Sequence, residues 1–164
     1  MTPSTHKFLD EGAILIRLPI TDELAADFAD ALRLLTARGK RSVSIYINSP
    51  GGLAEASLRI LEVIRVADIE VRTICLGRAS GSAAHLFLSG DERFAVSDAV
   101  ISFEDFHGDD RHDSRVIDGL RTQFIRHTAT KLGIKESEVE SWLATERVFV
   151  GSDIFTSGLA QATI

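Results

Sequence analysis

A run of β-forming residues that ends in a double glycine constrains this chain most. Residues 42–47, Ser-Val-Ser-Ile-Tyr-Ile, are rich in β-branched and aromatic side chains, which predicts a strand largely buried in a sheet. Residues 48–50, Asn-Ser-Pro, end that strand, and Gly51 and Gly52 precede an apolar-periodic segment that begins at Leu53. Two interpretations stay open from these residues alone. The glycines leave backbone N–H groups free to bind an oxyanion or an extended peptide, or they only make a tight turn.

Strand-like and helix-like segments alternate along the first half of the chain. Thr21 is the expected N-cap of the first helix, and Gly39 its expected end. The βαβαβ order predicts a single α/β domain with a parallel sheet and right-handed crossovers. Strands are predicted at 13–18, 42–47 and 70–76, and amphipathic helices at 22–38 and 53–67.

The second half of the chain predicts shorter strands and further helices. The small residues that begin the segment 77–90 indicate a turn that enters a buried helix. Ser137 and Glu140 have the spacing of a capping box, and Ser152 is a candidate cap for a last short helix. Further predicted elements are strands at 93–96, 99–103 and 148–150 and a long helix at 116–132.

Composition excludes several classes of function. The chain has 164 residues and a net charge of −6, and no basic cluster suggests a nucleic-acid partner. Its single cysteine, Cys75, excludes an internal disulfide and a multi-cysteine metal site, and we expect neither a metal nor another cofactor. Residues 1–12 form an expected flexible arm before a domain at 13–164. Because no apolar run is long enough for a signal-peptide core or a membrane span, a cytoplasmic location is expected.

Two motifs and the chain's last helical segment resemble the ClpP family, the proteolytic subunits of the Clp protease. The motifs are residues 46–52, Tyr-Ile-Asn-Ser-Pro-Gly-Gly, and residues 73–77, Thr-Ile-Cys-Leu-Gly. Gly158-Leu159 is similar to the end of the family's last helix, so the resemblance covers about 13–160. It implies a ClpP/crotonase-like fold, assembly into rings with active sites facing an inner chamber, and a Ser-His-Asp triad.

The residues at the matching triad positions depart from that pattern. The family's serine falls on Gly81, which has no side chain, and its histidine falls on Glu104. Its aspartate falls on Glu146 when counted back from Gly158, and a shifted alignment places Val148 there instead. Gly51 and Gly52 are retained, so the resemblance implies that an oxyanion or peptide-binding backbone survives.

A displaced site is a second possibility. Ser80 and Ser82 flank Gly81, and either hydroxyl could act as a nucleophile if a base lay nearby. The candidate bases are His85 and His107. The structural alternatives are close-packed small residues for the serines, a core or interface residue for His85 and a solvated loop for His107.

Three hypotheses follow. The first is a ring-forming subunit that lacks the triad, a homo-oligomer or a hetero-oligomer with an active paralogue. The second is a serine peptidase that uses Ser80 or Ser82. The third is a crotonase-like enzyme, or acyl-thioester binder, that uses Glu104 as an acid or base. The segment 104–133 and the N-terminal arm are shorter than in the family, which counts against stacked double rings and an ATPase partner.

Overall fold

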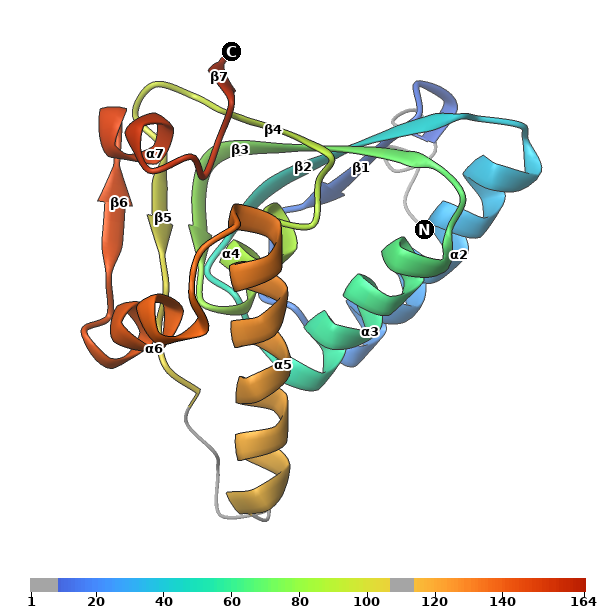
Figure 1. The fold of residues 1–164 in the computed structure, drawn as a ribbon. Coiled ribbons are helices and arrows are strands. Elements are labelled where there is room, and N and C mark those ends of the chain that lie inside the picture. The colour runs from blue at the N-terminus through green and yellow to red at the C-terminus, as the bar shows by residue number, and fades with distance from the viewer. Residues whose placement is uncertain (1–8, 107–113) are drawn as a thin grey trace.

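The strands that the computed structural model describes join in one sheet, in which every neighbouring pair but one runs parallel (Figure 1). The structure describes residues 9–106 and 114–164. The main path of the sheet has the order β1-β2-β3-β4-β7, while β5 pairs with β3 and runs antiparallel to β6. The strands are β1 (Ala13–Ile16), β2 (Ser42–Ser49), β3 (Glu70–Ser80), β4 (Glu92–Ala95), β5 (Val100–Ser102), β6 (Val148–Val150) and β7 (Ala162–Thr163).

The helices lie on one side of this sheet or extend from its end. Figure 1 shows α2 and α3 side by side beneath β1, β2 and β3, with α4 at the centre and the first turns of α5 projecting away from the sheet. The described helices are α2 (Asp22–Ala37), α3 (Ala54–Val66), α4 (Ser82–Phe87), α5 (Ser114–Leu132), α6 (Glu136–Ala144) and α7 (Ser152–Thr156).

The predicted βαβαβ alternation is confirmed. The Thr21 hydroxyl accepts the Leu24 N–H at 3.2 Å and so caps α2 as expected. Strand β2 buries only one face, because Val43, Ile45 and Ile47 point toward the helices. The Tyr46 side chain lies on the other face and is half-buried.

Strand β3 is longer than predicted. Gly77 was expected to end it after Leu76, but the strand continues to Ser80. Its first part pairs with β4 and its last part, from Arg78 to Ser80, pairs with β5. The register with β2 shifts between Ile47 and Ser49, and the Asn48 side chain accepts the Arg78 N–H at 3.1 Å across the shift. Strand β3 therefore continues past Gly77 because β5 provides a second strand to pair with.

Two predicted helix caps are wrong. Helix α6 begins at Glu136 with Lys135 as its N-cap, so Ser137 lies inside the first turn and no capping box forms. Gly151 is the N-cap of α7, and Ser152 is the first helical residue. The buried side chains of Val139 and Leu143 face the core at i and i+4 and set where α6 packs.

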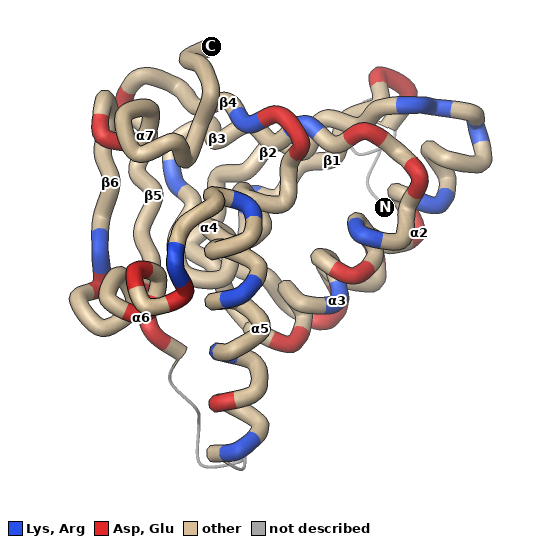
Figure 2. Tube along the Cα trace, viewed as in Figure 1, with Lys and Arg blue, Asp and Glu red and all other residues tan. Residues whose placement is uncertain are grey.

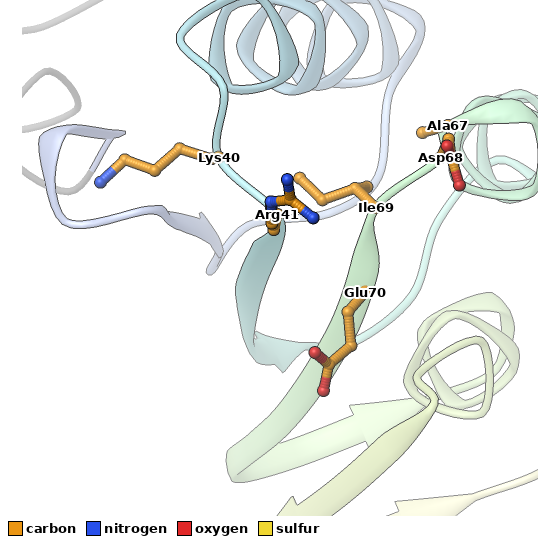
Figure 3. A pocket seen from close by; sticks show the side chains of 6 residues that line it. All are labelled: Lys40, Arg41, Ala67, Asp68, Ile69 and Glu70. Atoms are coloured by element: carbon orange, nitrogen blue, oxygen red, sulfur yellow. The ribbon is translucent and has the colours of Figure 1, made fainter.

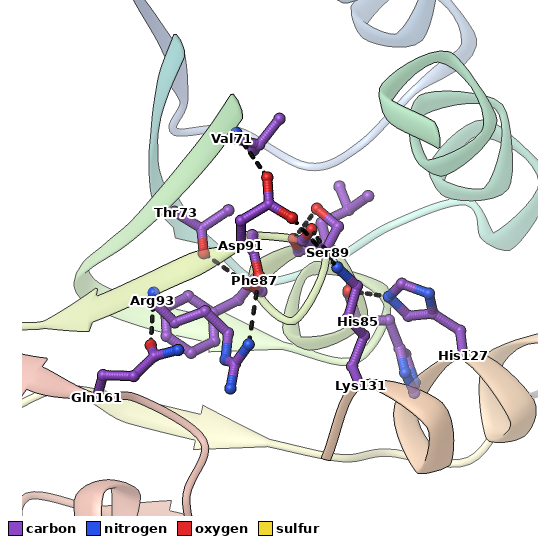
Figure 4. Close-up of polar contacts among 12 residues, drawn as sticks. Val71, Thr73, His85, Phe87, Ser89, Asp91, Arg93, His127, Lys131 and Gln161 are labelled. Carbon is purple, nitrogen blue, oxygen red and sulfur yellow. Dashed lines mark hydrogen bonds and ion pairs between the residues drawn. The ribbon is translucent and has the colours of Figure 1, made fainter. Parts of the chain in front are cut away.

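A buried arginine anchors the C-terminal end of the chain (Figure 4). Arg93, in β4, is 8% exposed and donates to the carbonyls of Leu159, Gly158 and Gly90 at 2.7, 3.3 and 3.2 Å. Its backbone N–H donates to the Gln161 side chain at 2.6 Å. Burial lowers the pKa of the guanidinium group, and nearby Asp91 opposes that effect. These bonds hold the segment that leads into β7 against β4.

The double glycine lies where three backbone segments meet. The Ile20 N–H donates to the Gly51 carbonyl at 2.8 Å, and the Leu53 N–H donates to the Ile20 carbonyl at 2.9 Å. A Cβ on Gly51, whose φ is +91°, would lie 2.5 Å from the Ser80 carbonyl oxygen, and one on Gly52 would overlap the Ile20 backbone. Only glycine fits both positions without displacing a neighbouring strand end.

Charges of both signs are interspersed over the surface, including along α5 (Figure 2). None of the helices that the structure describes combines the length and apolar character needed to cross a bilayer.

Replacement of Gly51 by alanine should lower the free energy of unfolding by at least about 2 kcal/mol, since left-handed strain adds to a backbone collision. Gly39→Ala is the matched control, because Gly39 has φ +73° and a Cβ at that position would have nothing within 4 Å. It should cost about 1 kcal/mol, the strain alone. Urea denaturation measures the free energy of unfolding of both variants. Equal decreases would show that the contact between a Cβ at position 51 and the Ser80 carbonyl has no cost.

Arg93→Ala should lower the free energy of unfolding by about 2–4 kcal/mol, because it leaves buried carbonyl groups without a donor. Arg33→Ala is the control, since Arg33 pairs with Asp30 on an exposed helix face with 77% of its side chain accessible. That change should stay within about 0.5 kcal/mol. Equal effects in thermal denaturation would exclude the anchoring role.

Candidate functional site

Positions 81 and 104 face each other at the end of β3. Gly81 is the N-cap of α4, with φ 52° and ψ −125°, and its N–H donates to the Ser102 carbonyl at 2.9 Å. A Cβ built on Gly81 would lie 3.8 Å from Glu104 Oε2. A side chain at 81 would therefore reach the carboxylate at 104, as a nucleophile reaches its base.

Glu104 is bound on its other side by Ser102 and Arg78. The Ser102 hydroxyl donates to Glu104 Oε1 at 3.0 Å, and an Arg78 guanidinium nitrogen lies 4.0 Å from the same oxygen. Arg78 Nε also donates to the Ser80 hydroxyl at 2.6 Å. The side chains of Ser80, Arg78, Glu104 and Ser102 thus form a continuous series of polar contacts next to Gly81, which has no side chain.

Both candidate serines are buried and engaged. Ser80 accepts from Arg78, and the Ser82 hydroxyl donates to the Gly52 carbonyl at 3.3 Å. Within the described part of the chain, neither hydroxyl has a histidine as a hydrogen-bond partner. A serine without such a base is a weak nucleophile.

His85 is a core residue, as one of the two interpretations of the sequence predicted. It is fully buried, and its Nδ1 lies 2.7 Å from Thr128 Oγ1 on α5. Burial, and then the nearby His127, lower its pKa to about 3. The imidazole is thus held against α5 and not turned toward Ser80 or Ser82. His107, the other candidate base, lies outside the described residues.

The third triad position can be judged from the β5–β6 register. Val148 is paired directly with Ser102, so both side chains lie on the same sheet face. Glu146 precedes β6 in a turn, with φ 48°, and its N–H donates to the Leu143 carbonyl at 3.2 Å. Among the residues that the structure describes, the side-chain partners of Glu104 are Ser102 and Arg78, and Glu146 is not one of them.

The two glycines of the turn differ in what they can offer a ligand. Gly51 is buried, and its N–H donates to the Ser49 hydroxyl at 3.2 Å. Gly52 is exposed, and its N–H has no acceptor within residues 9–106 and 114–164. The Gly52 N–H is therefore the one of the two that can donate to a bound peptide or oxyanion.

A hollow of about 610 Å³ lies elsewhere on the domain (Figure 3). It is lined by Lys40, Arg41, Ala67, Asp68, Ile69 and Glu70, where β2 and β3 begin. The candidate site lies at the opposite, carboxyl ends of these strands, which is where parallel sheets place their sites. The described residues also contain no group of three or more metal-binding side chains.

The sequence reasoning missed Arg78 and Ser102. Ser102 lies two residues before Glu104 at the end of β5, and the period-2 alternation of a strand would have placed it on the same face. Arg78 carried no such signal, because β3 was predicted to end before it.

Comparison with known proteins identifies the family of the chain. The sequence model of the Clp protease family matches residues 2–164. The chain is 29% identical over 168 residues to ATP-dependent Clp protease proteolytic subunit 2 of Frankia casuarinae, covering 96% of this chain and 77% of that protein. It is 34% identical over 98 residues to proteolytic subunit 1 of Bacillus cereus, covering 58% of this chain and 51% of that protein. Against proteolytic subunit 1 of Cutibacterium acnes the identity is 36% over 85 residues, covering 51% and 39%.

The family match extends over nearly the whole chain, and the parallel sheet, its βαβαβ order and the Gly51–Gly52 turn agree with the ClpP/crotonase-like fold. The chain belongs to the Clp protease family.

Proposed function

We propose that this chain is a ring-forming subunit of the Clp protease family that binds peptides without hydrolysing them. The observation that carries the proposal is the position of Gly81. It occupies the strand-to-helix turn opposite Glu104, where a Cβ would lie 3.8 Å from the carboxylate. Residue 81 thus lies where a nucleophile would face a base at residue 104, but glycine has no side chain that could attack.

The side chains around Gly81 and Glu104 support the same conclusion. Covalent hydrolysis needs an activated hydroxyl or thiol, and the hydroxyls nearest to Gly81 donate to a carbonyl or accept from an arginine. Glu104 accepts from Ser102 and lies near Arg78, so its contacts are those of a structural carboxylate. Binding needs less than hydrolysis, and the exposed Gly52 N–H can still pair with an extended peptide.

Assembly is the second part of the proposal. The first turns of α5 contain no buried residue, and Val116 there is 43% exposed. We propose that this part of α5 contacts other subunits, in a homo-oligomer or in a mixed ring with an active paralogue in the cytoplasm. The relatives carry names of ATP-dependent proteases. In a mixed ring, the dependence on ATP that these names state would be a property of the active subunit.

Two alternatives each have one observation in their favour. Ser82 reaches the Gly52 carbonyl and so lies at the turn where an acyl group would bind, which favours a displaced nucleophile. Glu104 Oε2 faces the space left by Gly81, which favours crotonase-like acid–base chemistry on a thioester. Turnover of an acyl-thioester that disappears in Glu104→Gln would establish the second alternative.

The purified chain should not react with a fluorophosphonate probe, whereas the variant Gly81→Ser/Glu104→His should be labelled and should hydrolyse a fluorogenic peptide at least about tenfold above background. The variant restores a hydroxyl within reach of an imidazole. Adding Val148→Asp should increase the rate further, because an aspartate there would lie on the face of residues 102 and 104. Gly81→Ala/Glu104→His is the matched control, with the same backbone strain and no hydroxyl.

Labelling of the unmodified chain that is lost in Ser80→Ala or Ser82→Ala would overturn the proposal in favour of the displaced nucleophile. A folded Gly81→Ser/Glu104→His variant that stays unlabelled would show that side chains at positions 81 and 104 cannot act as nucleophile and base.

A further inference from the structure

The joint between α4 and α5 is built from polar contacts (Figure 4). The His85 carbonyl in α4 and the Ser89 carbonyl, two residues past the end of α4, accept no backbone N–H within the described residues, and side chains of α5 supply donors to both. His127 Nε2 donates to the His85 carbonyl at 3.2 Å, and Lys131 Nζ donates to the Ser89 carbonyl at 2.9 Å. The contact between His85 Nδ1 and Thr128 Oγ1 at 2.7 Å completes the joint.

The His85 ring is enclosed by three phenyl rings, two from the segment after β5 and one from α5. Its centroid lies 5.5 Å from that of Phe103, 5.9 Å from Phe106 and 4.6 Å from Phe124. Its Nε2 is buried and has no hydrogen-bond partner within the described part of the chain. A neutral imidazole can leave that nitrogen as an unused acceptor, but an imidazolium would bury an N–H donor and a charge among phenyl rings.

The charged groups around the joint add to this cost. His127 faces His85 from α5, Lys131 lies near His127, and Asp91 lies 3.9 Å from Lys131. On the neighbouring segment, Asp105 is paired with Arg121 at 2.8 Å. The pKa of His127 is lowered to about 4, chiefly by burial; the bond to the His85 carbonyl opposes this effect, and the charge of Lys131 adds to it.

We propose that the neutral pair of His85 and His127 is a pH-sensitive latch that holds α5 on α4, and that protonation of the pair releases the C-terminal half of α5. A free histidine titrates near pH 6.5, so the latched state binds fewer protons than the released state. The latch is therefore complete above about pH 6.5 and weakens as pH falls toward the folded-state values. Two imidazolium groups near Lys131 would repel one another, and within residues 9–106 and 114–164 the carboxylate paired with Lys131 is that of Asp91.

The latch is connected to the candidate site through two short links. His85 lies one helical turn after Gly81 on α4, and Phe103 directly precedes Glu104. Phe103 also contacts Trp142, with ring centroids 5.3 Å apart. Release of α5 would therefore change the environment of Trp142 and the spacing of positions 81 and 104.

Trp142 is the only tryptophan of the chain, so its fluorescence reports on the latch. We expect a reversible change in the emission of the protein between pH 6.5 and 4. His127→Gln keeps a donor for the His85 carbonyl, and it should move the midpoint to lower pH. His85→Phe/Thr128→Val replaces both partners of a buried contact by apolar groups of similar shape, and combined with His127→Gln it should abolish the change above pH 4. His6→Gln, outside the described residues, is the control and should leave the midpoint unchanged.

Hydrogen–deuterium exchange at the midpoint distinguishes local release from general acid unfolding. Amides of α5 should exchange faster while those of β2 and β3 stay protected. An unchanged midpoint in His127→Gln, which removes one titrating group without removing its donor, would overturn the latch. So would simultaneous loss of protection in β2, β3 and α5.

Discussion

The backbone crossing at Gly51 and Gly52 is the contact on which the arrangement of the site depends. The end of β2 passes between Ile20 and the end of β3, and a Cβ on Gly51 would lie 2.5 Å from the Ser80 carbonyl. Because the main chains touch without side chains between them, the end of β3, the start of α4 and the exposed Gly52 N–H are held in fixed relation. The crossing fixes the start of α4 at Gly81, and the pairing of β3 with β5, extended by the bond from the Gly81 N–H to the Ser102 carbonyl, brings Glu104 opposite it.

The same short helix serves the candidate site and the body of the domain. Helix α4 is capped by Gly81 at its start, and near its end side chains of α5 donate to the carbonyls of His85 and Ser89. The contacts that link Ser80, Arg78 and Glu104 lie near the first end, and the contact between His85 and His127 lies near the second. The site is thus coupled to the helix proposed to contact other subunits through one six-residue segment.

Much of the fold could be predicted, because it depends on periodicity and on strong local signals such as Thr21 and the double glycine. The errors arose where pairing partners decide the outcome. Strand β3 continues past Gly77 because β5 offers it a second edge, and α6 starts before Ser137 because Val139 and Leu143 must reach the core. At the site, the family resemblance located 81 and 104, but the arginine that approaches the carboxylate belongs to the part of β3 that only the tertiary structure reveals.

At position 81, a side chain that could react would lower the stability of the fold. Its φ of 52° lies in the left-handed region, where any residue with a Cβ is strained by about 1 kcal/mol or more and glycine is not. A serine nucleophile in this turn would hold that strain permanently. Glycine avoids that strain, so stability alone favours glycine at this position over a residue that carries a hydroxyl.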